Sequence, residues 1–292
     1  NRAWRNVLFN QFHDIIGGSV IPEAERDAHI LYDETFKIGN DLLRKALESI
    51  SSKVCMDGDE MAIIVFNSLS WARSDVVDVE LKVPSDWKSI SIIDPEGEAV
   101  PLQIIKHGRN GKLRVLFEAE DVPSLGYKIF RVTRGEASIG YKDELRAEKD
   151  LLENGFYRIG INEIGLIDSI IDKKNGRELI AESLGGNLLQ LIEDMGDSEG
   201  RLIRYTSDGR IFNRSNIFVG KAWDITSKPT IKVVENGPVR ARVRITRSFK
   251  TSRYTQEVIL YSGLDRIDFN LRVDWHEIHS ALKVGFPFNI SD

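Results

Sequence analysis

A histidine and an aspartate stand side by side near the start of the sequence, where residues with helical spacing give way to a turn. His13 and Asp14 are followed closely by Gly17, Gly18 and Ser19, residue types that mark a tight turn. A histidine at such a helix end can ligate a metal ion through one ring nitrogen while a hydrogen bond orients the other. The neighbouring carboxylate can accept hydrogen bonds from sugar hydroxyls through its two oxygens. The pair alone is a weak motif, and the alternative is that both side chains only close the helix end.

A second group of metal-binding residue types lies near the C-terminus. Asp274, His276 and His279 offer three oxygen or nitrogen ligands of the kinds that zinc accepts. If Trp275 points inward at the end of a strand, Asp274 and His276 lie together on the opposite face, and His279 lies in the loop beyond. The alternative is a polar strand end that binds no metal.

Trp223 and Asp224 form a third candidate site. An aromatic ring can stack on the face of a sugar, and a carboxylate can bind the sugar's hydroxyls. The alternative for Trp223 is a core position at the edge of a strand.

Several arginines recur along one apolar stretch and could resemble an anion site. We predict instead a solvated strand face on which they pair with Glu and Asp of adjacent strands. The arginines are Arg240, Arg242, Arg244 and Arg247.

Residues 1–55 have the apolar spacing of helices. A short helix is predicted before His13, and a long one from Pro22, a residue that suits the first helical position. Along the long helix, small and apolar residues recur at alternating steps of four and three, as in a seam that packs on other helices. The seam consists of Ala24, Ala28, Leu31, Thr35, Ile38, Leu42 and Ala46. Two helices cannot bury such a seam alone, so we expect partner helices upstream of this sequence.

The rest of the sequence predicts two β-sandwiches. Residues 56–142 contain short strands separated by turns, which is typical of a small antiparallel sandwich. Residues 143–292 predict part of a large antiparallel sandwich, truncated at the C-terminus. A hairpin is expected at Asn175-Gly176, and a long loop at residues 195–216. The longest strands are predicted at residues 239–249, 254–261 and 266–275. The predicted fold class is therefore mainly β with an N-terminal helical segment.

Composition excludes several classes of function. The net charge is −5, with basic and acidic residues interspersed, so nucleic-acid binding has no electrostatic support. The single Cys55 excludes an internal disulfide framework and a cysteine-rich zinc site. No apolar run reaches membrane-spanning length and no signal peptide opens the chain, so we expect a cytoplasmic protein without a membrane partner. Both ends look like cuts, which predicts a larger parent; homo-oligomerisation is left open.

Several short motifs, in order along the chain, resemble those of the α-mannosidases of glycoside hydrolase family 38. The first is the window from Asn6 to Ser19, which contains Gln11-Phe12-His13-Asp14-Ile15; the family's turn is usually Pro-Gly where this sequence has Gly17-Gly18. The others are Val65-Phe66-Asn67-Ser68-Leu69-Ser70-Trp71, Glu153-Asn154-Gly155-Phe156-Tyr157, Asp172-Lys173-Lys174-Asn175-Gly176-Arg177-Glu178, Ala222-Trp223-Asp224-Ile225 and Asp274-Trp275-His276-Glu277. Each motif is modest, but the ordered set is specific.

The resemblance implies a retaining exo-mannosidase that acts on terminal α-linked mannose in oligosaccharides or simple mannosides. Such enzymes combine a catalytic (β/α) barrel, a helical domain and β-sandwich domains, the largest a supersandwich like that of galactose mutarotase. They hold one zinc ion with two His and two Asp. By resemblance, His13 matches the zinc ligand from the helical domain, and Asp14 matches a residue that binds the sugar's hydroxyls. The other ligands, the nucleophile and the acid/base belong to the upstream barrel, so no catalytic residue is expected here.

Two other functions remain as alternatives. One is a non-catalytic β-sandwich module that binds carbohydrate or serves a structural role. The other is a metal-binding protein that uses Asp274, His276 and His279, although the family comparison makes that cluster structural. The resemblance favours a mannosidase fragment that is inactive alone.

Overall fold

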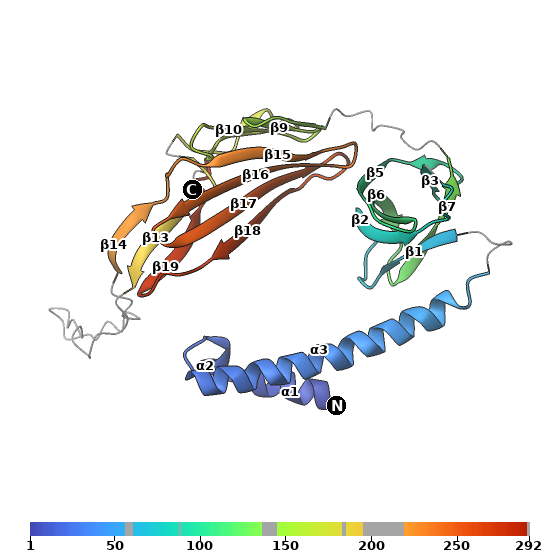
Figure 1. Cartoon of the computed structure of the whole chain (residues 1–292), viewed down its shortest axis with the longest axis horizontal. Coiled ribbons are helices and arrows are strands. Elements are labelled where there is room, and N and C mark those ends of the chain that lie inside the picture. The colour runs from blue at the N-terminus through green and yellow to red at the C-terminus, as the bar shows by residue number, and fades with distance from the viewer. Residues whose placement is uncertain (56–60, 88, 136–144, 183–184, 195–218, 291–292) are drawn as a thin grey trace. The chain divides into compact units, whose positions relative to one another are not determined.

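The chain folds into two compact units, Asn1–Glu60 and Met61–Asp292. The computed structural model describes residues 1–55, 61–87, 89–135, 145–182, 185–194 and 219–290 (Figure 1). Strands account for 49% of the described residues and helices for 17%, which confirms the prediction of a mainly β protein with a helical start. The predicted loop at 195–216 lies outside the described residues.

The first unit contains three helices: α1 (Arg2–Asn10), α2 (His13–Ile16) and α3 (Pro22–Ser51). α1 packs along the first half of α3 through polar side chains as well as apolar ones. The Asn10 side chain is fully buried and donates from Nδ2 to the carbonyl oxygen of Ala28 at 2.9 Å. Asn6 donates in the same way to Leu31 at 3.3 Å. These bonds attach α1 to the backbone of α3 and so fix the position of the α1–α2 corner.

Among residues 1–55, the part of this unit that the structure describes, the second half of α3 has no such partner. Leu42 and Leu43 have 62% and 57% of their surface exposed, and Ile50 is exposed as well. Of the predicted seam, Ala28 is buried and Leu31 half-buried, both in the first half. The helices of this unit therefore leave the second half of the predicted seam exposed, and the partner helices upstream stay a prediction.

We expect the second half of α3 to open more readily than any long strand of the chain. Few apolar contacts hold residues 42–50, and local stability follows local burial. Amide hydrogen exchange should show low protection there and high protection across the long strands of the second unit, residues 240–261. Equal protection of both regions, in a sample shown to be monomeric, would contradict this expectation.

The second unit begins with the small sandwich, whose two sheets have the orders β1-β7-β3-β4 and β2-β6-β5. Its strands are β1 (Met61–Asn67), β2 (Arg73–Lys82), β3 (Ile90–Ile93), β4 (Ala99–Val100), β5 (Leu102–His107), β6 (Lys112–Val122) and β7 (Gly126–Arg134). Alternating residues of both sheets meet in one core, where Ile92 and Phe117 are completely buried. Edge-to-face contact of Phe117 with Phe130, at 5.0 Å between ring centroids, joins the two sheets.

The large sandwich contains three sheets. A five-stranded sheet comprises β8 (Arg146–Ala147), β9 (Leu151–Glu153), β10 (Tyr157–Ile161), β11 (Ile167–Asp172) and β12 (Arg177–Glu178). A four-stranded sheet comprises β15 (Thr230–Asn236), β16 (Arg240–Phe249), β17 (Ser252–Tyr261) and β18 (Ile267–Asp274). A three-stranded sheet comprises β13 (Leu188–Asp194), β14 (Val219–Asp224) and β19 (Ser280–Gly285). The predicted hairpin at Asn175-Gly176 joins β11 to β12.

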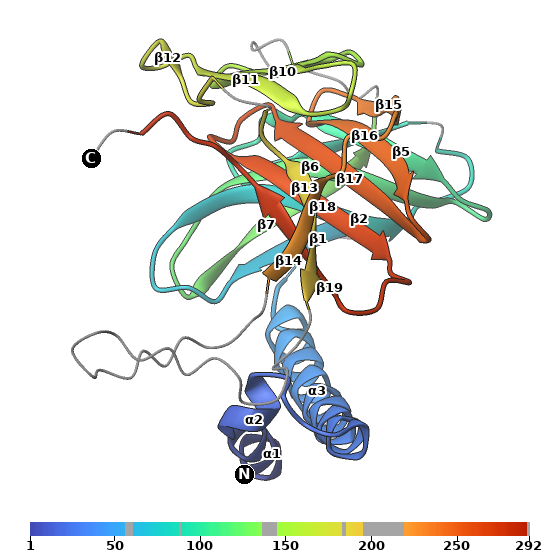
Figure 2. The same ribbon diagram turned by 90° about the vertical axis from the view of Figure 1, so that its left-hand side faces the viewer.

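One face of the β15–β18 sheet is covered by the β8–β12 sheet (Figures 1 and 2). Ile159 and Ile170 from the covering sheet share a core with Val243 and Val258. The inner residues of β16 and β17 are therefore mostly apolar, and their neighbours in sequence form the outer face of the sheet.

Arg247 corrects the prediction of a solvated arginine row. Arg240, Arg242 and Arg244 lie on the outer face and pair with carboxylates as expected, for example Arg244 Nε with Glu257 at 2.7 Å. Arg247 is an odd number of residues away, so it lies on the inner face and is 3% exposed. Its guanidinium donates to the carbonyl oxygens of Ile225 and Ile164 at 2.8 and 2.9 Å, and burial lowers its pKa.

Candidate functional site

His13 is the first residue of α2, a single helical turn that follows the end of α1 at Asn10. The prediction placed His13 at the end of a helix; the structure instead starts a new turn there. The imidazole is 81% exposed, and its Nε2 lies 3.5 Å from Oδ1 of Asp14. The Phe12 ring lies against it, with centroids 4.4 Å apart. Both candidate groups are thus adjacent and on the same corner of the helical unit, and the Asp14 side chain is 49% exposed.

The glycines after α2 shape this corner. The Gly17 amide donates to the His13 carbonyl at 3.0 Å, and a Cβ at position 17 would lie 2.9 Å from that same oxygen. Gly18 has φ +73°, a conformation that favours glycine. The amide of Ser19 then returns to the Asp14 carbonyl at 3.0 Å. The backbone of both site residues is therefore held by a turn that larger residues would strain.

A structural zinc site needs four ligands, and a catalytic one three plus a water or substrate. In the part of the chain that the structure describes, no three His, Cys, Asp or Glu side chains are grouped as a metal site. His13 and Asp14 together supply at most two donors. The α2 corner could therefore supply one ligand to a metal site that residues elsewhere complete.

The C-terminal cluster is smaller than the sequence suggested. His276 Nε2 lies 3.1 Å from Asp274 Oδ1, but His279 does not form a three-residue metal group with them among the described residues. The adjacent Glu277 has a structural role, because its Oε1 accepts hydrogen bonds from Thr251 N, Thr251 Oγ1 and Ser252 Oγ, each at 2.9 Å. Partial burial opposes ionisation of Glu277, but these hydrogen bonds outweigh it and lower its pKa. Glu277 thereby ties the chain after β18 to the β16–β17 turn.

Trp223 lies opposite Leu191 and packs on the core beside Tyr254. The Lys250 ammonium sits over the indole, 4.0 Å from the ring centroid. Asp224 accepts a hydrogen bond from Gln190 Nε2 at 2.8 Å. These contacts favour the core alternative for Trp223, and a sugar-binding role for this pair stays a prediction.

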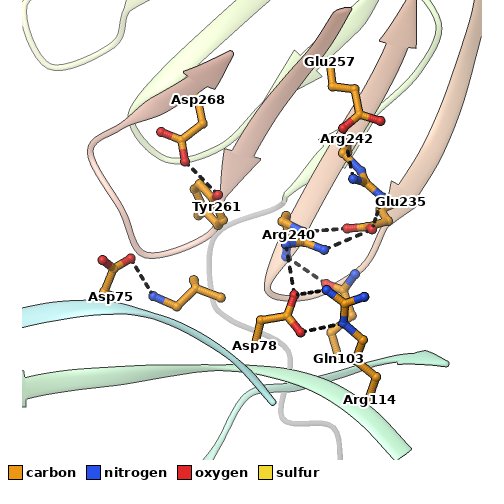
Figure 3. Close-up of polar contacts among 11 residues, drawn as sticks. Asp75, Asp78, Gln103, Arg114, Glu235, Arg240, Arg242, Glu257, Tyr261 and Asp268 are labelled. Carbon is orange, nitrogen blue, oxygen red and sulfur yellow. Dashed lines mark hydrogen bonds and ion pairs between the residues drawn. The ribbon is translucent and has the colours of Figure 1, made fainter. Parts of the chain in front are cut away.

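A set of polar contacts that no sequence motif indicates joins the two sandwiches. We call it the polar joint and define it by Asp75, Asp78, Gln103, Arg240 and Arg266. Figure 3 labels the first four of these residues. Gln103 Oε1 accepts hydrogen bonds from the backbone amides of Val239 and Arg240 at 3.2 and 2.8 Å. Arg266 Nη2 donates to Asp75 at 3.2 Å. No local sequence pattern can predict the polar joint, because its partners are far apart in the sequence. Gln103, for example, is 136 residues from Val239.

Arg240 occupies the centre of the polar joint (Figure 3). Its Nε lies 2.6 Å from Glu235, and its Nη1 lies 3.8 Å from Asp78. Asp78 also accepts two hydrogen bonds from Arg114, at 2.7 and 2.9 Å. The Arg240 side chain is only 14% exposed, so these carboxylates compensate a largely desolvated charge.

The two sandwiches also fit sterically at this joint. Neither Gly237 nor Gly263 has a positive φ, yet a Cβ on either would overlap a side chain of the small sandwich. Gly237 leaves room for the Gln103 amide, and Gly263 for the buried carboxylate of Glu118. A side chain at either position would therefore have to displace the Gln103 amide or the Glu118 carboxylate.

Two protein-family models match the chain in order. The alpha mannosidase middle domain matches residues 1–50, and the glycosyl hydrolases family 38 C-terminal domain matches residues 152–292. Together they cover about two thirds of the sequence. The chain belongs to glycoside hydrolase family 38.

Curated relatives named alpha-mannosidase match along almost the whole chain. Alpha-mannosidase 2C1 is 25% identical in Mus musculus and 26% identical in Homo sapiens, and each match covers 98% of this chain. Alpha-mannosidase G of Dictyostelium discoideum is 24% identical over 97% of it. The chain spans about a quarter of the length of these relatives, because the matches cover 24% to 27% of them.

Solved structures show the same fold. An alpha-mannosidase from Enterococcus faecalis superposes with a TM-score of 0.71 at 18% identity, covering 98% of this chain and 38% of that one. A structure described as a protein in glycosyl hydrolase family 38 from Enterococcus faecalis gives a TM-score of 0.73, also at 18% identity, with 98% and 40% covered. None of the helices described for this family 38 chain combines the length and apolar character that a bilayer crossing requires.

Proposed function

We propose that this chain is part of a retaining, zinc-dependent α-mannosidase that removes terminal α-linked mannose. The observation that carries the proposal is the ordered match of the family's middle and C-terminal domains to one chain. Relatives named alpha-mannosidase match the same residues and the segment between them. A non-catalytic carbohydrate-binding module would not require the middle domain that carries His13 and Asp14.

In this proposal His13 supplies one zinc ligand through an imidazole nitrogen, and Asp14 binds hydroxyls of the terminal sugar. The exposure of both side chains on one corner supports these roles, since neither group is occupied by the core. Zinc, when bound, polarises and orients the oxygens of its ligand sugar. Asp14 would fix the sugar by charge-assisted hydrogen bonds, which are stronger than neutral ones.

The two carboxylates of a retaining mechanism, nucleophile and acid/base, would come from parts of the parent outside these 292 residues. The parent would act on mannose-containing oligosaccharides or mannosides. Cys55, free and exposed, fits the reducing conditions of the proposed cytoplasmic location.

The isolated chain should therefore fail to hydrolyse an aryl α-mannoside that the full-length parent hydrolyses. One sugar-binding carboxylate cannot replace the transition-state stabilisation of two missing ones. The measurement is release of the aryl group by both purified proteins, with a mock purification as the control. Turnover by the isolated chain above that control would contradict the proposal that the catalytic carboxylates lie outside these 292 residues. An inactive full-length parent would contradict the proposed mannosidase activity.

A further inference from the structure

We propose that the outer face of the β15–β18 sheet binds a carbohydrate bearing one anionic group, a phosphate or a carboxylate. The proposal rests on the proposed function only in its choice of a sugar as the ligand. A groove of about 760 Å³ lies on this face, within the size range of small-molecule sites. Its walls come from β16, β17 and β18, so three rigid strands position the side chains.

Strand register arranges these side chains in rows across the sheet. One row contains Thr246, Thr255 and Arg272, and the next contains Arg253 and Asp274. Residues on the same face of neighbouring rows are about 7 Å apart along the strand. Arg253 and Arg272 are therefore diagonal neighbours, with the hydroxyl of Thr255 beside both.

The arginines of this face differ in their partners. Arg242 and Arg244 share the Glu257 carboxylate, at 3.0 and 2.7 Å, and Arg242 also binds Glu235 at 2.6 Å. The side chains of Arg253 and Arg272 are exposed and form no hydrogen bond or ion pair with any residue that the structure describes. Asp274 is opposite Arg253 in register, but its Oδ1 contacts His276 at 3.1 Å. The guanidinium groups of Arg253 and Arg272 at this end of the groove are therefore free to bind an anion.

The surrounding groups select the class of ligand. Two guanidinium groups can bind a phosphate or carboxylate with paired hydrogen bonds. Thr246, Thr255 and Asn270 line the same groove with hydroxyl and amide groups that can both donate to and accept from sugar hydroxyls. A long polyanion fits poorly, because Glu257 and Asp274 interrupt the basic face and the chain carries a net charge of −5. One anionic group among several hydroxyls matches this pattern.

The test is calorimetric titration of the full-length protein with mannose 6-phosphate, mannuronic acid, neutral mannose and inorganic phosphate. We expect at least one of the two anionic sugars to bind, and the stronger of them identifies phosphate or carboxylate as the preferred group. Arg253→Ala and Arg272→Ala should each weaken that binding by about tenfold or more, whereas Arg131→Ala, an exposed arginine on β7, should not. Neutral mannose and inorganic phosphate should bind more weakly than the anionic sugar.

Four results would overturn the proposal. They are no binding of either anionic sugar, binding unaffected by both arginine variants, equal affinity for inorganic phosphate, and tighter binding of an acidic peptide of the same charge. Hydrolysis of a neutral aryl α-mannoside by the same variants should stay at the wild-type rate. If the wild-type protein binds the anionic sugar but hydrolyses no mannoside, the proposed function fails and this site stands.

Discussion

In the full-length protein, His13→Ala should remove zinc and α-mannoside turnover together. The exposed imidazole on the α2 corner is the one metal ligand that the family resemblance assigns to this chain, and metal affinity falls steeply when one ligand is removed. Loss of a hydrogen-bond partner behind a metal ligand already costs 10- to 100-fold in affinity or activity, so loss of the ligand should exceed about 100-fold. Zinc content and kcat/KM on an aryl α-mannoside are the measurements.

His29→Ala is the matched control for this variant. His29 is also exposed on a helix of the same unit, and its Nε2 lies 3.8 Å from the Glu25 carboxylate. It therefore shares the chemistry of the His13–Asp14 pair without its proposed ligand role. Both zinc content and activity should survive His29→Ala, and stoichiometric zinc in His13→Ala would refute the ligand assignment.

Asp14→Asn should separate the two properties, keeping zinc while lowering turnover. The amide preserves the shape of the carboxylate but removes its charge, and a hydrogen bond to a charged group contributes about 1.5–3 kcal/mol. Each lost bond then corresponds to about tenfold to 100-fold in kcat/KM. A fall in kcat would show that the bonds tighten in the transition state; normal kcat/KM would refute the sugar-binding role.

At the polar joint, Gln103→Ala and Gly237→Ala should each destabilise the second unit, and their effects should not add. Gln103→Ala leaves the buried amide of Val239 without its acceptor, a loss of about 1–3 kcal/mol. Gly237→Ala inserts a methyl group where the Gln103 amide lies, and overpacking of this kind costs about 1–3 kcal/mol. Truncating Gln103 makes room for that methyl group, so the double variant should resemble Gln103→Ala alone.

Urea denaturation of the four proteins, followed by circular dichroism, gives this double-mutant cycle. Gly285→Ala is the control for a glycine-to-alanine change without overpacking, because its Cβ would meet no atom closer than 3.7 Å. It should change the free energy of unfolding much less than Gly237→Ala. Additive losses in the double variant would show that the two side chains do not compete for one space.

The sequence was a good guide wherever burial alternates along a strand. Residues 239–249 were predicted as a strand because apolar and arginine positions alternate, and β16 covers Arg240–Phe249. The prediction for Arg247 was wrong, because Arg247 was grouped with the other arginines by residue type. The alternation along the strand places it on the inner, buried face of the sheet. β15 was not predicted as a strand. All its residues are exposed or half-buried, so they show no apolar periodicity. β8 and β12 are two residues long, too short for any pattern.

The candidate site was predictable only in its local part. His13 and Asp14 are neighbours in sequence, so a short window is enough to find them and the glycines that shape their turn. The polar joint depends on pairs such as Gln103 with Gly237, whose proximity is created by folding over more than 130 residues. Trp223 shows the converse limit, since a residue type suited to sugar stacking is also suited to a core, and only its contacts distinguish the two.

The buried Arg247 has a consequence for how these sequences can diverge. Gly165 has φ +70°, and a Cβ there would lie 2.7 Å from both Arg247 Nη2 and Ile245 Cγ2. The Gly165 carbonyl in turn accepts from that guanidinium at 3.2 Å. A side chain at position 165 would displace the guanidinium from its acceptors and leave a buried charge uncompensated. The two positions should therefore covary, so that relatives with another residue in place of Gly165 also lack the arginine at 247.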